Sequence, residues 1–370
     1  MLNFLKNLWG AETKPAKRKS KRPASRRVLG MEGLESRDLM AVGVSLVSPQ
    51  VEIQPVVPAA VSVKVVNSDL YIYGTNGADK VQVSPPVNGK YVVKITTEVY
   101  GRATTQTSSW GFTGGDVFFF GYGGDDHFAA NNVTLRVTAY GGDGNDYLLG
   151  SYAADNLNGG EGRDEVRGGG ANDKLYGNGG NDKIFGYDGN DRINGGTGYD
   201  RIFGEGGDDT LLVGYDFARN YVEGGAGNDT IEGSLGNDEL LGGAGNDTIS
   251  ASDGDDIVQG NDGNDYLFGG YGNDNLNGGA GDDYLYGSLG NDYLYGGDGL
   301  DYLYGDEGDD DLDGGAYEEI DYLYGQGGKD RFRRDPFVNH WYQNEYGIPS
   351  PGPGEYNCIM DLEPGEVIYD

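Results

Sequence analysis

A nine-residue phrase, glycine-rich and then Asp-x-apolar-x, repeats along this chain from residue 141 to residue 333. One copy, residues 278–286, reads Gly-Gly-Ala-Gly-Asp-Asp-Tyr-Leu-Tyr. Counted from the first glycine, the sixth position is Asp in every unit except the one with Asn220, and the eighth is always Leu, Ile, Val or Phe. A disordered Gly/Asp-rich tract has no reason to keep an apolar residue at one fixed position. The period therefore indicates a folded repeat.

The copies form two long runs. Eight stand in register over residues 141–212, and ten follow without a gap over residues 224–313. A degenerate copy, residues 215–223, lies between the runs, and two further copies carry Asp321 and Asp330. Because each interruption is short, the units can stack as one continuous array.

Each position of the unit has a physical role. Glycines at positions one, two and four allow the positive φ angles that a tight turn requires. The triplet at positions seven to nine predicts a minimal strand in which only the middle side chain points inward. Nine residues then make one turn and one strand, and two units close a circuit. Successive circuits stack as parallel strands roughly 4.8 Å apart.

Within each run, the position-six aspartate recurs every eighteen residues along each edge of such a coil. Stacked like charges repel one another and cannot persist without a cation between them. Calcium accepts about six to eight oxygens from carboxylates and carbonyls, whereas magnesium demands tighter octahedral geometry. Zinc prefers the His and Cys ligands that residues 141–333 lack. The spacing therefore predicts calcium between successive circuits.

With these tandem copies, residues 141–333 resemble the calcium-binding RTX (hemolysin-type) repeat family. The resemblance implies an all-β fold, a parallel β-roll in the form of a right-handed β-solenoid with two nonapeptides per turn. It also implies multiple Ca²⁺ ions between same-side turns, held by position-six aspartates and turn carbonyls. One edge would use Asp146, Asp164, Asp182, Asp200, Asp238, Asp256, Asp274, Asp292, Asp310 and Asp330. The other would use Asp155, Asp173, Asp191, Asp209, Asp229, Asp247, Asp265, Asp283, Asp301 and Asp321.

Several units depart from the family pattern. Ala replaces the fourth-position glycine at Ala153, Ala171 and Ala218, and Glu319 takes that place in a unit near the end of the array. Asn220 replaces the aspartate. These departures put individual sites in doubt and leave roughly fifteen ions on the family geometry.

The formal net charge of −33 is spread unevenly. Residues 1–40 hold ten Lys and Arg against four Asp and Glu, so the acidic excess lies in the rest of the chain. Bound dications would cancel most of that excess, which links calcium to folding, and without them self-repulsion should leave the repeats expanded. Cys358 is the only cysteine, so calcium rather than an internal disulfide would staple the fold. No apolar run is long enough to predict a transmembrane segment.

Residues 1–60 predict a disordered basic export segment rather than a folded domain. Residues 14–27 form a basic run, and the apolar stretch at 41–47 has some features of a Sec signal. Residues 34–40, Leu-Glu-Ser-Arg-Asp-Leu-Met, resemble the Leu-Glu-x-Arg-x-Leu-Leu motif near the N-terminus of some large exported bacterial proteins. The alternative is an arm that touches any anionic surface, nucleic acid included. No nucleic acid is expected as a partner of the roll itself.

Residues 61–140 predict an irregular β lead-in that caps the roll, because a solenoid needs atypical ends. An independent sandwich domain is the alternative. Isolated copies of the phrase carry Asp79 and Asp126. Alternating apolar residues predict strands over Ser62–Val66, Leu70–Tyr73, Tyr91–Val99, Val117–Phe120 and Val133–Thr138.

Residues 334–370 are expected to cap the other end. Residues 358–368 resemble the Asp-Phe-x-Pro-x-x-Asp-x-Ile ending of many RTX rolls, with Leu362 in place of Phe, and predict a closing strand. RTX proteins generally leave the cell through type I exporters. The resemblance therefore implies a secreted or cell-surface bacterial protein.

Positions seven and nine flank the buried residue and face solvent. In the last third of the roll, one sheet would present an aromatic ladder and the other mostly polar groups. The ladder would stabilise neighbouring strands, and a contiguous aromatic strip also suits a glycan or protein ligand. If the strip has a ligand, Tyr284, Tyr302 and Tyr322 would carry the binding. The ladder consists of Tyr266, Phe268, Tyr284, Tyr286, Tyr302, Tyr304, Tyr322 and Tyr324.

Catalytic signals are weak. The histidines are His127, inside a repeat-like turn, and His340, past the last unit, and a Ser-His-Asp arrangement would need one of them in a pocket. The paired carboxylates would be committed to ions, so no catalytic residue is assigned. We therefore expect an exported, calcium-binding structural, surface or adhesion-type protein. The alternative is a folding and export module of a small secreted enzyme, such as a polysaccharide-active hydrolase.

Overall fold

The computed structural model describes residues 60–99, 102–109, 112, 114–315, 321–333, 357–359 and 367–369. The chain divides into two compact units, Met1–Val56 and Val57–Asp370. The first unit lies outside the described residues, and so does nearly all of the predicted export segment. Most of the predicted C-terminal cap, with His340, also lies outside them.

The regular elements of the described residues are strands, which form two sheets. Sheet A has the spatial order β1 (Ser62–Val66), β2 (Asp69–Tyr73), β6 (Val117–Gly123), β8 (Val137–Asp143), β10 (Asn156–Glu161), β12 (Lys174–Gly179), β14 (Arg192–Thr197), β16 (Thr210–Leu212), β18 (Thr230–Glu232), β20 (Thr248–Asp253), β22 (Tyr266–Tyr271), β24 (Tyr284–Leu289), β26 (Tyr302–Glu307), β28 (Asp321–Gly327) and β30 (Asn357–Ile359). Sheet B has the order β31 (Val367–Tyr369), β29 (Arg331–Arg333), β27 (Asp311–Gly315), β25 (Tyr293–Asp298), β23 (Asn275–Ala280), β21 (Ile257–Asp262), β19 (Glu239–Ala244), β17 (Tyr221–Ala226), β15 (Arg201–Gly206), β13 (Lys183–Asp188), β11 (Glu165–Gly170), β9 (Tyr147–Leu149), β7 (His127–Ala130), β3 (Asp79–Val87), β4 (Lys90–Val99) and β5 (Arg102–Ser109).

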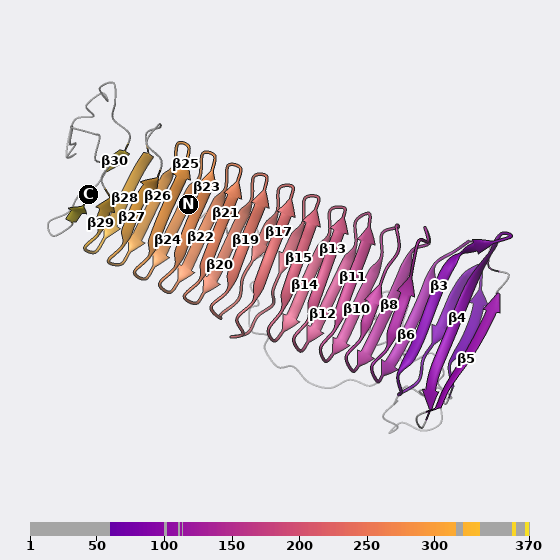
Figure 1. The fold of residues 1–370 in the computed structure, drawn as a ribbon. Coiled ribbons are helices and arrows are strands. Elements are labelled where there is room, and N and C mark those ends of the chain that lie inside the picture. Colours follow the sequence, from indigo (N-terminus) through magenta and orange to yellow (C-terminus); the bar gives the residue numbers. More distant parts are fainter. Residues whose placement is uncertain are drawn as a thin grey trace, which may run out of the picture. The chain divides into compact units, whose positions relative to one another are not determined.

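From β6 onward the chain alternates between the two sheets, so two strands and two turns make one circuit (Figure 1). Strands of neighbouring circuits pair in parallel, and residues with the same position in the repeat lie opposite one another. Leu285, for example, lies between Leu267 and Leu303. This arrangement confirms the expected parallel β-roll with two nonapeptides per circuit.

Most strands of the roll are longer than the predicted three-residue triplet, whereas β9, β16, β18 and β29 span only the triplet. β24 runs from position seven of one unit through position three of the next, and Ser288 pairs with Gly270 beyond the triplet. The parallel strand pairing continues there because the first two residues of the next unit stay close to the neighbouring backbone. In β24 the side of the strand that faces the core carries Leu285 and then Gly287, which has no side chain to exclude the neighbour.

The core of the roll is one apolar residue thick. The position-eight side chains are buried in every described strand of the roll, from Leu148 through Leu285 to Phe332. Burying one such side chain stabilises the fold by about 1.5–3 kcal/mol. Each strand contributes only one, so the turns at the two edges decide much of the remaining stability.

The lead-in belongs to the same two sheets. β2 pairs in parallel with β6, and β3 pairs in parallel with β7. β1 adds to sheet A in antiparallel fashion, while β4 and β5 extend sheet B beyond β3 as an antiparallel meander (Figure 1). The core continues through this part, with Ile72, Val81 and Phe128 all buried.

One predicted strand of the lead-in is wrong in its bounds. The strand predicted over Val133–Thr138 begins only at Val137. The preceding residues follow a turn in which Asn132 has φ 57°, a conformation that ends regular pairing. Val133 and Leu135 are still buried, so their apolar character reflects packing rather than a strand.

At the C-terminal end, β30 pairs with β28 and β31 pairs with β29, both in parallel. The segment predicted to form a closing strand thus contributes one strand to each sheet. Among the described residues, no helix has the length and apolar character that a membrane crossing needs.

Candidate metal centres along the two edges of the roll

The turns that join the sheets depend on backbone conformations that favour glycine. In the unit beginning at Gly278, the second and fourth positions, Gly279 and Gly281, have φ angles of 118° and 129°. Most L-amino acids avoid this region because the Cβ atom meets the backbone. These two residues turn the chain so tightly that the aspartate at position six points back into the turn.

The position-six aspartates form one continuous row along each edge. The main-chain N–H of Asp265 donates to Oδ1 of Asp283 at 2.8 Å, and the N–H of Asp283 donates to Oδ1 of Asp301 at 2.9 Å. The same bond joins every pair of successive members on both edges, so the structure brings together all twenty predicted aspartates in their two expected rows. Edge one runs Asp79, Asp126, Asp146, Asp164, Asp182, Asp200, Asn220, Asp238, Asp256, Asp274, Asp292, Asp310 and Asp330. Edge two runs Asp155, Asp173, Asp191, Asp209, Asp229, Asp247, Asp265, Asp283, Asp301 and Asp321.

Most of these carboxylates leave their second oxygen without a hydrogen-bond partner. All of the aspartates in the two rows are buried. A buried polar atom without a partner is costly, and a buried charge more so. The following aspartates have a buried, unpartnered Oδ2: Asp126, Asp146, Asp164, Asp173, Asp182, Asp191, Asp200, Asp209, Asp229, Asp247, Asp256, Asp265, Asp274, Asp283, Asp292 and Asp310.

Carbonyl oxygens lie beside these unpartnered atoms. A Cβ added to Gly278 would lie 2.3 Å from Oδ2 of Asp283 and 2.5 Å from the carbonyl oxygen of Gly296, one circuit further on. The first-position glycine therefore leaves free a space that two oxygens line. Carboxylate and carbonyl oxygens are the ligands that calcium accepts, so the residues present fit this ion. Among the described residues, no group of three or more His, Cys, Asp or Glu side chains gathers as a metal site.

Burial raises the pKa values of these carboxyl groups. For Asp283, desolvation is the main cause, and the charges of Asp301 and Asp265 add to it. The N–H of Asp265 opposes the rise, and the pKa reaches about 8. The pKa of Asp126, Asp164, Asp173 and Asp256 likewise rises to about 8. Without a cation, burial therefore favours the protonated form, and a dication in the turn would favour the ionised form.

A second row of side chains, which was not predicted from the sequence, ties the circuits together at position five. The N–H of Asp282 donates to Oδ1 of Asn264 at 3.1 Å, and the N–H of Asn264 donates to Oδ1 of Asn246 at 2.9 Å. These residues are exposed. The signal in the sequence is that position five is Asn or Asp in most units. Asp126 was also missing from the predicted set, although it stands in an isolated copy of the phrase.

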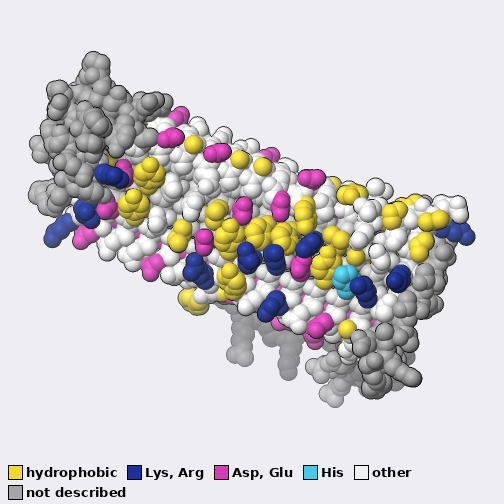
Figure 2. All heavy atoms as spheres, viewed as in Figure 1, with side chains coloured by type: hydrophobic (Ala, Val, Ile, Leu, Met, Phe, Trp, Pro, Cys, Tyr) yellow, Lys and Arg dark blue, Asp and Glu magenta, His cyan; other side chains and the backbone are white. Residues whose placement is uncertain are grey.

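The two sheet faces differ in how they pack. On sheet A, Tyr284 and Tyr302 stack at 4.7 Å, and Tyr286 and Tyr304 stack at 4.8 Å. On sheet B, Phe185 and Phe203 also stack, at 5.0 Å, and cations lie over such rings, with Lys183 Nζ 4.5 Å from the centre of the Phe185 ring. Figure 2 shows one face of the roll, on which hydrophobic side chains form a band with Lys and Arg beside them. His127 belongs to this packing, because its ring stacks on Tyr147 at 4.5 Å.

A family model described as RTX calcium-binding nonapeptide repeat matches this chain over residues 138–151, 149–184, 159–193, 185–214, 218–249, 250–285 and 286–316. These matches include the members of the two aspartate rows from Asp146 to Asp310. A search of curated proteins finds no match.

Proposed function

Because this chain belongs to the RTX calcium-binding nonapeptide repeat family over residues 138–316, we propose that it is an exported structural or adhesion-type protein whose folding is driven by multiple Ca²⁺ ions between stacked turns. The twenty aspartates predicted from the sequence hold these ions, except in turns where hydrogen-bond donors of the chain already contact both carboxylate oxygens. Asp126 extends the row on edge one.

One observation carries this proposal, namely the row of buried carboxylate oxygens without a partner. Leaving a charged group buried and uncompensated is strongly destabilising. A dication beside each oxygen would remove that cost, and neighbouring carbonyl oxygens would complete its coordination. The binding energy of the ions then becomes folding energy.

The same physics favours a compartment rich in calcium. Calcium sites of extracellular modules bind with dissociation constants of about 10⁻⁴–10⁻³ M, so such a roll would stay ion-free in a cytosol poor in calcium. We therefore place the protein outside the cell or on its surface. Residues 1–60 serve export, residues 61–140 and 334–370 cap the roll, and residues 141–333 bind the ions.

Circular dichroism and isothermal titration calorimetry of the full chain test the proposal. The spectrum should be coil-like after calcium removal and become β-rich on adding calcium, with saturable uptake of several ions per chain. A β-rich spectrum that does not respond to a chelator, together with no calcium uptake, would exclude it.

The Tyr-rich face of sheet A stabilises the roll by ring stacking, and we propose ligand binding as its second role. Its rings stack on one another almost in parallel, with 3° between Tyr284 and Tyr302. Stacking occupies the ring faces, so a glycan or protein ligand would meet ring edges and hydroxyl groups. A glycan array in calcium, comparing the unmodified chain with a variant carrying serine in place of Tyr284, Tyr302 and Tyr322, tests whether the face binds. Equal retention by both chains would remove it as a binding surface.

A further inference from the structure

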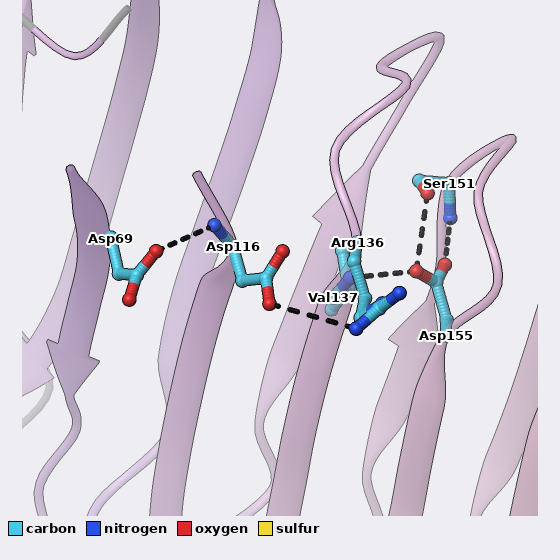
Figure 3. Close-up of polar contacts among 6 residues, drawn as sticks. All are labelled: Asp69, Asp116, Arg136, Val137, Ser151 and Asp155. Carbon is cyan, nitrogen blue, oxygen red and sulfur yellow. Dashed lines mark hydrogen bonds and ion pairs between the residues drawn. The ribbon is translucent and has the colours of Figure 1, made fainter. Parts of the chain in front are cut away.

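The carboxylates of Asp155 and Asp238 have hydrogen-bond partners for both oxygens. Oδ2 of Asp155 accepts the N–H of Ser151 at 2.6 Å, while Oδ1 accepts the N–H of Val137 at 2.6 Å and the Ser151 hydroxyl at 3.2 Å (Figure 3). Oδ2 of Asp238 accepts the N–H of Ser234 at 2.8 Å and its hydroxyl at 3.0 Å. Neither carboxylate keeps the unpartnered Oδ2 of the sixteen aspartates named above. We call these two turns closed and the turns of those sixteen aspartates open.

A serine at position two is not enough to close a turn. Ser288 also stands at position two, yet it has a φ of 84°, and Oδ2 of Asp292 in the same unit has no partner. Ser252 and Asp256 repeat this combination, with a φ of 86° at the serine. These open turns keep the positive φ of the glycines, whereas Ser151 and Ser234 do not have it. Backbone conformation, rather than residue type, separates the two classes.

The closed turns are held by the serine hydroxyl. The N–H of Ala153 donates to Oγ of Ser151 at 2.9 Å, and the N–H of Gly236 donates to Oγ of Ser234 at 3.4 Å. Each hydroxyl thus receives a main-chain N–H of its own turn and donates to the aspartate. This is a local turn that Ser side chains form readily. It directs donors toward the carboxylate that an ion would otherwise contact.

In the middle of edge one, an amide takes the place that a carboxylate has elsewhere. Nδ2 of Asn220 donates to Oδ1 of Asp238 at 3.0 Å, to Oγ of Ser234 at 3.2 Å and to the carbonyl oxygen of Ala218 at 3.2 Å. Its own Oδ1 accepts the N–H of Asp200 at 2.9 Å, so the row continues. A neutral N–H₂ group therefore meets three oxygens from two successive turns.

In each open turn, the unpartnered Oδ2 faces the space between its own circuit and the next circuit, which we call a gap. In the space beside Gly195, Oδ2 of Asp200 and the carbonyl oxygen of Val213, which lies in the next circuit, face the same point. By the same placement, Asp155, Asn220 and Asp238 each stand before one gap. In those gaps the chain supplies donors where the open turns supply only acceptors.

We propose that the gaps after Asp155, Asn220 and Asp238 hold no calcium, and that the two on edge one form an ion-independent joint in the middle of the roll. This inference rests on the proposed function, since it concerns which turns take up calcium. The joint divides edge one into two calcium-binding blocks, Asp126–Asp200 and Asp256–Asp310. Successive circuits stay tied at the joint by hydrogen bonds of the chain alone.

Two isosteric substitutions in adjacent turns of the same edge test the proposal. Bound calcium per chain is measured by equilibrium dialysis for the unmodified chain, Asp238→Asn and Asp256→Asn. We expect Asp256→Asn to lose at least one ion and Asp238→Asn to lose none. A loss from Asp238→Asn as large as that from Asp256→Asn overturns the inference while leaving calcium binding intact. No uptake by the unmodified chain would instead overturn the proposed function.

A matched pair of serine variants gives a second test that does not change any carboxylate. Ser234→Ala removes the hydroxyl of a closed turn, and Ser288→Ala removes one from an open turn. In saturating calcium, Ser234→Ala should lower the thermal midpoint and Ser288→Ala should leave it nearly unchanged, with the number of bound ions the same in both. Equal midpoints for the two variants would contradict the role given to the closed turn.

Discussion

Asp282 and Asp283, neighbours in the chain, tie their circuit to the two adjacent circuits in opposite directions. Oδ1 of Asp282 accepts the N–H of Leu300 in the next circuit at 3.1 Å. Oδ1 of Asp283 accepts the N–H of Asp265 in the preceding circuit at 2.8 Å. The exposed bond satisfies its acceptor, whereas the buried one leaves Oδ2 of Asp283 without a partner. Only the second residue therefore needs a cation.

Asp283→Asn should have opposite effects with and without calcium. In calcium it removes a charged ligand and should lower the free energy of unfolding by about 1–3 kcal/mol. Without calcium, the Asp283 carboxyl must bind a proton to be buried, whereas asparagine is neutral at every pH, so the variant should make the residual structure more stable. Thermal unfolding followed by circular dichroism in both conditions measures this. Asp282→Asn is the matched control, and a similar response of the two variants would argue against the assigned ligand.

Acid should partly replace calcium. The carboxyl groups of Asp164 and Asp283 have folded-state pKa values of about 8, against 3.8 for the ordinary group, so the folded chain binds more protons than the unfolded chain. Their stabilising contribution is complete below about pH 4 and is lost as pH rises through about 8. The calcium-free chain should therefore be more folded at pH 5 than at pH 8. Circular dichroism across this pH range measures the folded fraction of the calcium-free chain, and a fraction that rose with pH would contradict the prediction.

Leu285→Ala should destabilise the roll in calcium by about 2–5 kcal/mol, because its side chain is fully buried in a core only one residue thick. Leu289→Ala lies one turn away, at a side chain that is 41% exposed, and should change stability by no more than about 0.5 kcal/mol. Chemical unfolding in saturating calcium compares the two. Equal losses would mean that the core is not organised by position eight.

Tyr302→Ser should weaken the roll without changing its ion count. Tyr302 stacks between Tyr284 at 4.7 Å and Tyr322 at 4.9 Å, and each cross-strand pair contributes roughly 0.2–1 kcal/mol. Tyr271→Ser, at a turn residue that is 61% exposed, is the control. Thermal midpoints in calcium and calcium uptake by calorimetry are the measurements. A changed number of ions in Tyr302→Ser would show that the ladder also shapes the turns.

Most of the architecture could be predicted from the nine-residue period. Because strand and turn share one repeat, any residue type kept at one position must occupy one environment. Leu285 at position eight could thus be placed in the core, and Asp265 and Asp283 could be placed on the same edge one circuit apart. The six-residue strands were not predicted, because pairing beyond the triplet depends on how closely Gly287 lets two backbones approach.

The difference between open and closed turns could not be read from the repeat. Ser234 and Ser288 occupy the same position, and both are followed by Leu-Gly-Asn-Asp. Their backbones nevertheless differ, because the turn of Ser234 packs against the Asp216 turn of the preceding circuit, where Leu235 N–H donates to the Asp216 carbonyl oxygen at 2.9 Å. Local pattern thus specified the repeating unit and the row of acidic groups, since both follow from residue spacing. Stacking specified which carboxylates keep a free oxygen, since that depends on the backbone conformation that each turn adopts against the neighbouring circuit.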